Sequence, residues 1–486
     1  MAQTHGQSSW IQGPWSWLVW MVLGGAAGLG VAAMLPAVYA QDAVKPEIPL
    51  WLVAPFAALL LGVAVMPFVA RSFWHHRYPE VSLFLGGAVA AYMVRAFDRP
   101  GYENGMSFGT ASMLHAGIEY YSFIALVGGL FLASGGILVD VRGRGGPWIN
   151  GAMLFFGAVL ANLVGTTGAS VLLIRPFMRI NRGRLTPMHV VFFIFIVSNC
   201  GGSLTPIGDP PLYLGFLKGV PFFWTFFNLW PDWLLVIGLL ISAFVIYDYR
   251  VGAGDPERLP DVAHPGITVR GGVAIGGMGL LILGVFIDPV IKSRASQWGV
   301  EFLQGLPVGA TFQIVVALGT FALSSKAIRE QNGFNLEPIK EVGLLFAGIF
   351  ATMAPALAYL ATHGKEFGLD TATAFYAGTG VLSAVLDNAP TYMNFLQIAV
   401  GDKGAVSPPV IAEFLGTPSG TLTLHAISTA AVFFGAMTYI GNGPNFMVKA
   451  IAESSGVKMP SFFGYLLRAT LILFPVLVIH WAVFVR

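Results

Sequence analysis

Two aspartates lie inside long apolar stretches of this chain, each beside residues that interrupt a helix. Asp209 belongs to the segment TPIGDPP at 205–211, and Asp387 begins DNAP at 387–390. A charged group at mid-membrane costs roughly 2.5 to 3.5 kcal/mol on insertion scales, so such groups are expected to have a function. Carboxylate oxygens suit a hard cation such as Na⁺, and either aspartate could exchange a proton for it.

The segment around Asp209 has a second copy. TPIGDPP returns 233 positions later as TYIGNGP at 438–444, with the Thr, the Ile, the first Gly and the last Pro retained. Irregular backbone at membrane depth is tolerated only where it lines a protected or watery cavity. Two such breaks, one in each half of a chain, indicate the binding site of a transporter.

Neutral polar residues cluster at both breaks and at two further interruptions, GTTG at 165–168 and DNAP at 387–390. Their hydroxyl and amide oxygens suit Na⁺, whereas helix N-termini suit an anion, and the two aspartates favour the cation. The alternative is that these small residues only let helices pack closely. We predict Na⁺ at Asp209 and Asp387, surrounded by the neutral candidates Asn388, Asn199, Ser198, Thr205, Thr166, Thr167, Thr391, Thr438 and Asn442.

Three other titratable residues allow more than one interpretation. His115 and Glu119 are four positions apart, hence on one helix face. They could form a proton relay or gate, because histidine titrates near neutral pH, or an interfacial polar pair. His425, near the start of the second broken segment, could be a ligand, but it is interpreted as an interfacial histidine.

Composition indicates the elements that must position these residues. Of 486 residues, 56% are hydrophobic and 10% are charged, against roughly 25% charged in soluble domains. Apolar runs of about 20 residues recur along the chain, which predicts an all-α polytopic membrane protein in contact with the lipid bilayer. A net charge of +2 argues against nucleic acid as a partner, and one cysteine excludes an intramolecular disulfide. The segment GMSFG at 105–109 matches the G-x-S-x-G motif of hydrolases, but it is predicted in a loop rather than between a strand and a helix. We therefore expect no enzyme, and no cofactor beyond Na⁺ and H⁺ as transported or coupling ions.

We predict ten spans, of which two are broken helices. The interrupted segments 150–180 and 371–400 have arms of about 15 residues, roughly 22 Å, which is too short for a ~30 Å hydrocarbon core. We therefore expect two re-entrant hairpins. The spans lie near 50–70, 80–97, 109–139, 187–217 (broken), 222–248, 272–291, 307–325, 339–363, 422–450 (broken) and 461–485.

The order of parts repeats, which predicts two halves, 41–248 and 272–486, joined by a cytoplasmic linker at 249–271. Each half has an odd number of crossings, so the second is inverted relative to the first. Most of the 26 Lys and Arg residues fall on the predicted inner side, in accord with the positive-inside rule. This topology suits a bacterial inner membrane, with residue 41 and the C-terminus periplasmic.

Residues 1–40 allow two interpretations. An apolar run from Trp17 ends in AVYA at 37–40, which resembles a signal-peptidase site. A cleaved signal is the leading interpretation, but the run is long for a signal peptide and no Lys or Arg precedes it, so the alternative is an eleventh span.

Three stretches resemble the ion transporter superfamily: GTTGAS at 165–170 with Arg175-Pro176, SNCGGSLTPIGDPPLYLGFLKGVPFF at 198–223, and SAVLDNAPT at 383–391. The chain is similar from about residue 50 to its C-terminus to bacterial citrate transporters and NhaD-type sodium:proton antiporters. The resemblance implies a homodimer and carboxylates that bind Na⁺ and H⁺ in alternation. Such antiporters tend to have Asp-Asn at both hairpin tips, whereas the first tip here has Gly165-Thr166.

Two functions follow from these residues. The leading hypothesis is a secondary transporter that exchanges Na⁺ for H⁺ by alternating access. The alternative is a Na⁺- or H⁺-coupled transporter of citrate or a related small carboxylate, in which the amide-rich tips hold the anion and the aspartates hold the coupling cations.

Overall fold

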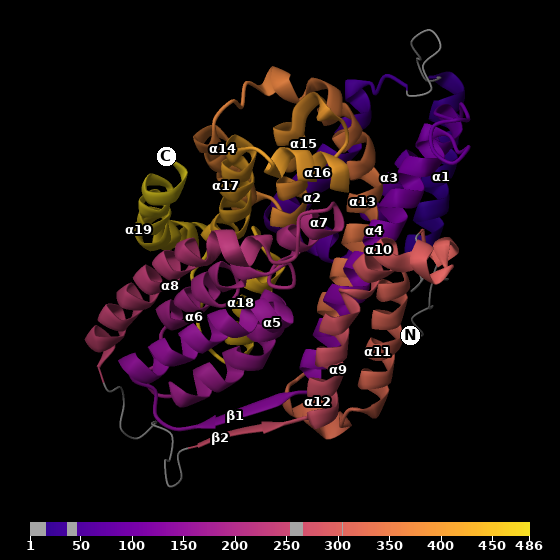
Figure 1. The fold of residues 1–486 in the computed structure, drawn as a ribbon. Helices are drawn as coiled ribbons and strands as arrows, with labels where there is room; N and C mark the ends of the chain where they lie inside the picture. Colours follow the sequence, from indigo (N-terminus) through magenta and orange to yellow (C-terminus); the bar gives the residue numbers. More distant parts are fainter. Residues whose placement is uncertain (1–15, 36–45, 253–265, 304) are drawn as a thin grey trace, which may run out of the picture. The chain divides into compact units, whose positions relative to one another are not determined.

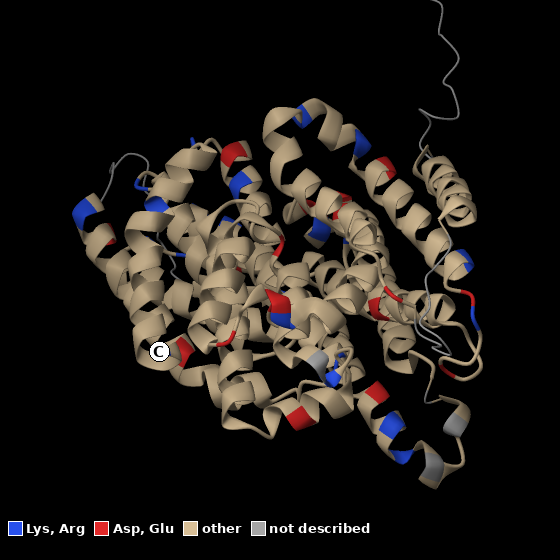
Figure 2. Cartoon of the chain, turned by 90° about the horizontal axis from the view of Figure 1, so that it is seen from above, with Lys and Arg blue, Asp and Glu red and all other residues tan. Residues whose placement is uncertain are grey.

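The computed structural model describes residues 16–35, 46–252, 266–303 and 305–486, and these form an almost entirely helical chain (Figure 1). Within these residues, ten helical segments are long and apolar enough to cross a membrane. Charged residues are sparse along the helices in Figure 2. Large apolar side chains such as Phe227, Leu318 and Leu471 are exposed on these helices, as expected of surfaces that face lipid rather than water. The all-α polytopic class is confirmed.

Most predicted spans are observed as helices close to the expected bounds. The predicted span 80–97 is the longer α3, and 307–325 is a shorter helix, α11. The predicted span 272–291 is two helices, because the chain turns at Val285-Phe286. The helices at the spans predicted to be unbroken are α2 (Ala54–Val69), α3 (Arg71–Ala96), α4 (Phe108–Gly135), α8 (Trp224–Val251), α9 (Gly272–Gly284) with α10 (Ile287–Trp298), α11 (Val308–Leu323), α13 (Glu337–His363) and α19 (Phe462–His480).

The N-terminal segment contains a further apolar helix, α1 (Ser16–Met34), which is long enough to span a membrane. The candidate cleavage site at 37–40 lies outside the described residues. Both interpretations of residues 1–40 therefore stay predictions.

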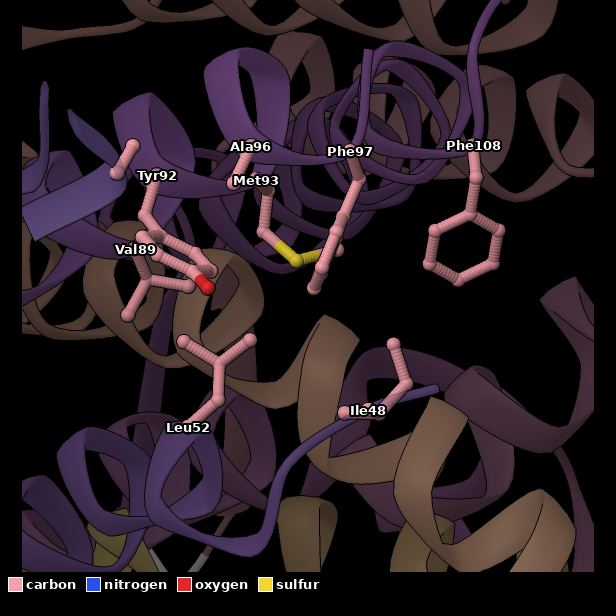
Figure 3. Packing of buried hydrophobic residues seen from close by; sticks show 9 residues of the cluster. Ile48, Leu52, Val89, Tyr92, Met93, Ala96, Phe97 and Phe108 are labelled. Atoms are coloured by element: carbon pink, nitrogen blue, oxygen red, sulfur yellow. The ribbon is translucent and has the colours of Figure 1, made fainter. Parts of the chain in front are cut away.

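The chain divides into two compact units, and each contains parts of both sequence halves. The first comprises Met1–Tyr121 and Leu336–Gly364. Its core includes Leu52, Tyr92, Met93 and Phe97 (Figure 3). In the same unit α3 and α13 pack closely, because Ser82 Oγ donates to the carbonyls of Leu344 and Leu345 at 3.0 Å each.

The second unit, Ser122–Asn335 and Lys365–Arg486, contains both predicted hairpins and both broken helices. The first hairpin is α5 (Pro147–Ile180), and the second is α14 (Ala372–Val385) with α15 (Asn388–Val400). The broken helices are α6 (Pro187–Ile196), η2 (Cys200–Leu204) and α7 (Pro210–Leu217), then α17 (Pro418–Phe434), η7 (Gly435–Met437) and α18 (Gly443–Ser454).

A two-stranded sheet was not predicted. β1 (Leu138–Arg142) pairs antiparallel with β2 (Gly266–Arg270), so that Asp140 is opposite Thr268. β2 is the end of the predicted linker, and residues 253–265 of that linker lie outside the described residues. Arg179, at the exit of the first hairpin, forms an ion pair with Asp140 of β1. Segments predicted to lie on the inner side are thus in contact. The division into inverted halves stays a prediction.

Candidate functional site

Both predicted hairpins fold back on themselves at the expected residues. In α5 the backbone leaves helical geometry at Gly165, where φ is 79° and ψ is 154°. Asn150 Nδ2 then donates to Asn181 Oδ1 at 2.8 Å, although the two would lie about 46 Å apart in a straight helix. In the second hairpin, a Cβ on Gly378 would lie 2.8 Å from Cε1 of Phe395, so these arms also pack together.

The two helix breaks close in the same way. A Cβ on Gly208 would lie 2.1 Å from the carbonyl oxygen of Gly202, and a Cβ on Gly441 would lie 2.6 Å from that of Gly435. The second pair is the first displaced by the 233 positions of the sequence repeat. Only glycine permits these backbone approaches, which explains why both copies of the motif need glycine there.

Asp209 is the centre of the arrangement. It is the N-cap residue of α7 and only 1% exposed. Its carboxylate accepts three hydrogen bonds, from Thr166 Oγ1 (2.8 Å), Asn442 Nδ2 (2.9 Å) and Asn388 Nδ2 (2.6 Å). The donors come from the first hairpin tip, the second break and the second hairpin tip. All four predicted irregular segments therefore meet at one carboxylate.

The partners of Asp209 are neutral. Within the described part of the chain, no Lys, Arg or His forms an ion pair with its carboxylate. Asp387 is the N-cap residue of α15, where its Oδ1 accepts from the backbone N–H of Ala389 at 3.0 Å. It is close enough to Asp209 for the two carboxylates to interact electrostatically. A buried carboxylate is unfavourable without a compensating charge, so this site attracts a cation or a proton.

Buried oxygens next to Asp209 could complete a cation site. Asn199 donates to Asn445 Oδ1 at 2.6 Å and to the carbonyl of Ile194, while its own Oδ1 is buried with no hydrogen-bond partner. A Cβ on Gly435 would lie 3.3 Å from this Oδ1, 3.3 Å from the carbonyl oxygen of Gly441 and 3.4 Å from Asn388 Nδ2. Three polar groups thus converge beside Gly435.

Ser198 is the other predicted residue at this point. Its carbonyl oxygen accepts from Asn442 Nδ2 at 3.4 Å, and its hydroxyl lies 2.7 Å from that of Ser170 in the second arm of α5. Ser198 therefore connects the first hairpin to both breaks.

The predicted threonines have different surroundings. Thr205 Oγ1 donates to the carbonyl of Asn162 at 2.6 Å, and Thr438 Oγ1 donates to that of Ala384, also at 2.6 Å. Each joins a helix break to the first arm of the hairpin in its own half. Thr391 Oγ1 donates to the carbonyl of Asp387 within its own helix. Thr167 is half-buried. Of the predicted threonines, only Thr166 is hydrogen-bonded to Asp209.

His115 and Glu119 lie on α4 in the first unit, whereas Asp209 lies in the second. The site described above therefore does not include them. His115 is exposed, and its Nε2 lies 3.4 Å from Oε1 of Glu103 in the preceding loop. The relay or gate role stays a prediction.

A comparison with known protein families gives a match that covers nearly the whole chain. Residues 45–485 match the family described as "Putative citrate transport", CitMHS_2, which spans both breaks and both hairpins. The chain belongs to this family. No curated protein matches the sequence. As a member of the CitMHS_2 family with ten candidate spans among its described residues, the protein is a multi-pass membrane transporter of the citrate or ion transporter type.

Some residues of this CitMHS_2 site were not singled out as ligands from the sequence. Asn445 holds the second break, because its Nδ2 donates to the carbonyls of Gly435 and Thr438 at 2.8 and 2.9 Å. Gly435 lies outside the seven-residue repeat, but it is 233 positions after Gly202 in GGSL. A search for single glycines at the repeat spacing would have found it.

Proposed function

We propose that this protein is a secondary transporter that exchanges Na⁺ for H⁺ by alternating access, with the two ions binding in turn at Asp209. The observation that carries the proposal is a buried carboxylate whose three hydrogen-bond donors are all neutral. One Na⁺ or one H⁺ compensates the charge of this carboxylate equally well, and the two ions cannot occupy its oxygens at the same time. Competition for one carboxylate is the requirement for exchange.

The amides around Asp209 support this role, because each offers a donor and an acceptor at the same place. Asn388 and Asn442 direct their NH₂ groups at the carboxylate. A half-turn of either amide about its last torsion directs its oxygen there instead, where it can ligate Na⁺. Asn199 Oδ1 and the carbonyl oxygen of Gly441 lie beside Gly435 as further ligands.

The hairpin tips supply the moving parts of the proposal. Thr166 and Asn388 contact the same carboxylate from different hairpins. Withdrawal of one tip removes one of these hydrogen bonds and opens Asp209 to one side of the membrane. We assign the inner side to the first hairpin and the periplasmic side to the second, in a bacterial inner membrane, and expect a homodimer.

The family description favours a second candidate, cation-coupled transport of citrate or a related carboxylate. Four helical segments have their N-termini at this site: they begin at Thr166 after the Gly165 turn, at Pro210, at Asn388 and at Gly443. Such N-termini stabilise anions. In this alternative the coupling cation binds at Asp209, and the substrate carboxylates contact the tip amides.

Purified protein in proteoliposomes separates the two candidates. With a Na⁺ gradient and no organic acid present, we expect proton movement in the opposite direction, and we expect Asp209→Asn to abolish it. Asp370→Asn changes an exposed aspartate before the second hairpin and serves as the matched control. Absence of Na⁺-driven proton movement, together with Na⁺- or H⁺-driven uptake of labelled citrate, would reject exchange in favour of the second candidate. Absence of both activities would reject both.

A further inference from the structure

A second buried carboxylate in the same unit is bonded to two histidines. Asp232 of α8 is 1% exposed, and its Oδ1 lies 2.6 Å from Nε2 of His480 on α19 and 2.9 Å from Nε2 of His425 on α17. His480 is fully buried and His425 is 8% exposed. The ring of His425 therefore packs inward against Asp232, while its position at the membrane interface stays a prediction. None of the three residues contacts Asp209.

The same helix has a second buried aspartate, which provides a comparison. Asp248 follows Asp232 by 16 residues, about 24 Å along α8. Its carboxylate lies 2.6 Å from Nη2 of Arg184, 2.8 Å from Nε2 of His189 and 2.8 Å from Nδ2 of Asn150. Because a guanidinium is charged at every accessible pH, Asp248 is compensated without a second proton on the His189 ring.

The two histidine rings differ at their other nitrogen. The backbone N–H of Thr186 donates to His189 Nδ1 at 3.1 Å, so that nitrogen is an acceptor and the ring is neutral. His480 Nδ1 instead lies 2.9 Å from the Tyr376 hydroxyl, which also lies 3.2 Å from the carbonyl oxygen of Leu477. When Tyr376 donates to Leu477, its oxygen is free to accept from a protonated Nδ1. A doubly protonated His480 therefore has a partner for each N–H.

The charges around Asp232 favour that extra proton. Within the described residues its ion pairs are with His425 and His480 alone. The other titratable groups nearby are Tyr376 from α14 and Cys200 from η2, which interacts with Tyr376. Beyond α19 the chain ends in Arg486, whose guanidinium lies over the ring of Trp481. With two neutral imidazoles the cluster is an anion, and one added proton makes it neutral.

We propose that Asp232, His425 and His480 form a second proton-binding site, in which His480 carries the bound proton as an imidazolium paired with Asp232. The proton adds to His480 Nδ1, and no other bond changes. A metal ion is not the expected ligand, because both Nε2 atoms are directed at one carboxylate oxygen and the described residues contain no group that could hold a metal. His425 Nδ1 and Asp232 Oδ2 are buried without partners.

Ring-nitrogen NMR of the full-length protein in lipid nanodiscs tests this site without a transport assay. The chain has nine histidines, and His→Gln variants at 189, 425 and 480 assign their signals. At about pH 5, well below the ordinary histidine pKa, we expect both ring nitrogens of His480 to be protonated. In the same spectrum His189, the matched control, should be neutral with a proton on Nε2 alone.

Two variants remove the features that hold the proton. Asp232→Asn removes the counter-ion, and we expect His480 to be neutral in it at the same pH. Tyr376→Phe removes the acceptor for Nδ1–H and should lower the fraction of imidazolium while Asp232 is still present. This second variant tests the proposal if Asp232→Asn fails to fold. A neutral His480 in the unmodified protein between pH 5 and pH 8, or an imidazolium that neither variant alters, would overturn the proposal. Neither result depends on whether Na⁺ is exchanged for H⁺.

Discussion

Asn388 Nδ2 donates to Asp209 Oδ2 over 2.6 Å, although the two residues are 179 positions apart in the chain. The bond joins the tip of the second hairpin to the break of the first broken helix. Thr166 Oγ1 makes the corresponding contact from the first hairpin, at 2.8 Å to Oδ1 of the same aspartate. One carboxylate is thus held by both hairpin tips, and in the proposed exchange the ion bound there determines which tip stays in contact.

Replacing Asn388 by alanine should destabilise the protein. Loss of the donor leaves a buried carboxylate oxygen without its partner, which costs about 1–3 kcal/mol, and more where the group is charged. Asn394→Ala is the control, because Asn394 lies on the same helix but donates to the carbonyl of Pro390 within it. Thermal unfolding of the purified protein measures the difference. Equal losses for the two variants would show that the contact with Asp209 contributes nothing specific.

Asp209→Asn should abolish stabilisation by Na⁺ while preserving the fold. A ligand at 100 times its Kd stabilises the native state by about 2.7 kcal/mol, and removal of the charge removes the cation. The fold persists because a neutral amide is less costly to bury than a carboxylate and because Asn388 can turn its own oxygen toward the new NH₂. The melting temperature is compared in NaCl and in choline chloride at equal ionic strength. A Na⁺-dependent increase retained in the variant would place the cation elsewhere.

Much of this site could be predicted from sequence, because helix breaks in apolar segments are conspicuous. The four interruptions named Asp209, Asn388, Asn442 and Thr166, and the structure brings these residues together. Composition could not separate Thr166 from Thr205 and Thr438, which have the same residue type and also lie at interruptions. Those hydroxyls are bonded to backbone carbonyls, and which way they point depends on turn geometry that no periodicity encodes.

The pairing of Asp232 with His480 could not be predicted in the same way. The residues are 248 positions apart, lie in unbroken helices and belong to no motif. Their contact depends on how α8 and α19 are rotated about their axes. Both helices have apolar residues on nearly every face, so their sequences give little information on that rotation. The pairing of β1 with β2 was not predicted either, since each strand has only five residues and the central pair of the register, Asp140 and Thr268, is 128 positions apart.

Gly435→Ala should weaken Na⁺ binding with little loss of stability. The new methyl would lie 3.3 Å from Asn199 Oδ1 and from the carbonyl oxygen of Gly441, in the space where these oxygens converge. Neighbouring atoms need to shift by only a few tenths of an ångström, so the fold tolerates the change. Gly238→Ala on α8 meets no atom within 4 Å and is the control. If the Na⁺ concentration for half-maximal stabilisation is the same in both variants, the oxygens beside Gly435 are not ligands.

Thr205→Val and Thr438→Val should destabilise the protein to a similar extent. Each removes a 2.6 Å hydrogen bond to a hairpin carbonyl and an acceptor for a backbone N–H, that of Gly208 or Ile440. We expect a loss of about 1–3 kcal/mol for each, with Na⁺-dependent stabilisation retained because neither hydroxyl contacts Asp209. Unfolding with and without Na⁺ separates the two roles. A variant with normal stability and no response to Na⁺ would show that its threonine is a ligand.

Arg184→Met should be the most destabilising of these changes, and Asp248→Asn should largely reverse its effect. The guanidinium lies 2.6 Å from Asp248 Oδ1 and also donates to the carbonyl of Gly252 at 3.0 Å. Its removal leaves a fully buried carboxylate with only neutral partners, His189 and Asn150, which costs about 3–5 kcal/mol. In the double variant that charge is absent. A double-mutant cycle on the free energy of unfolding should therefore give a large coupling energy. Additive effects would show that Arg184 does not stabilise the buried carboxylate of Asp248.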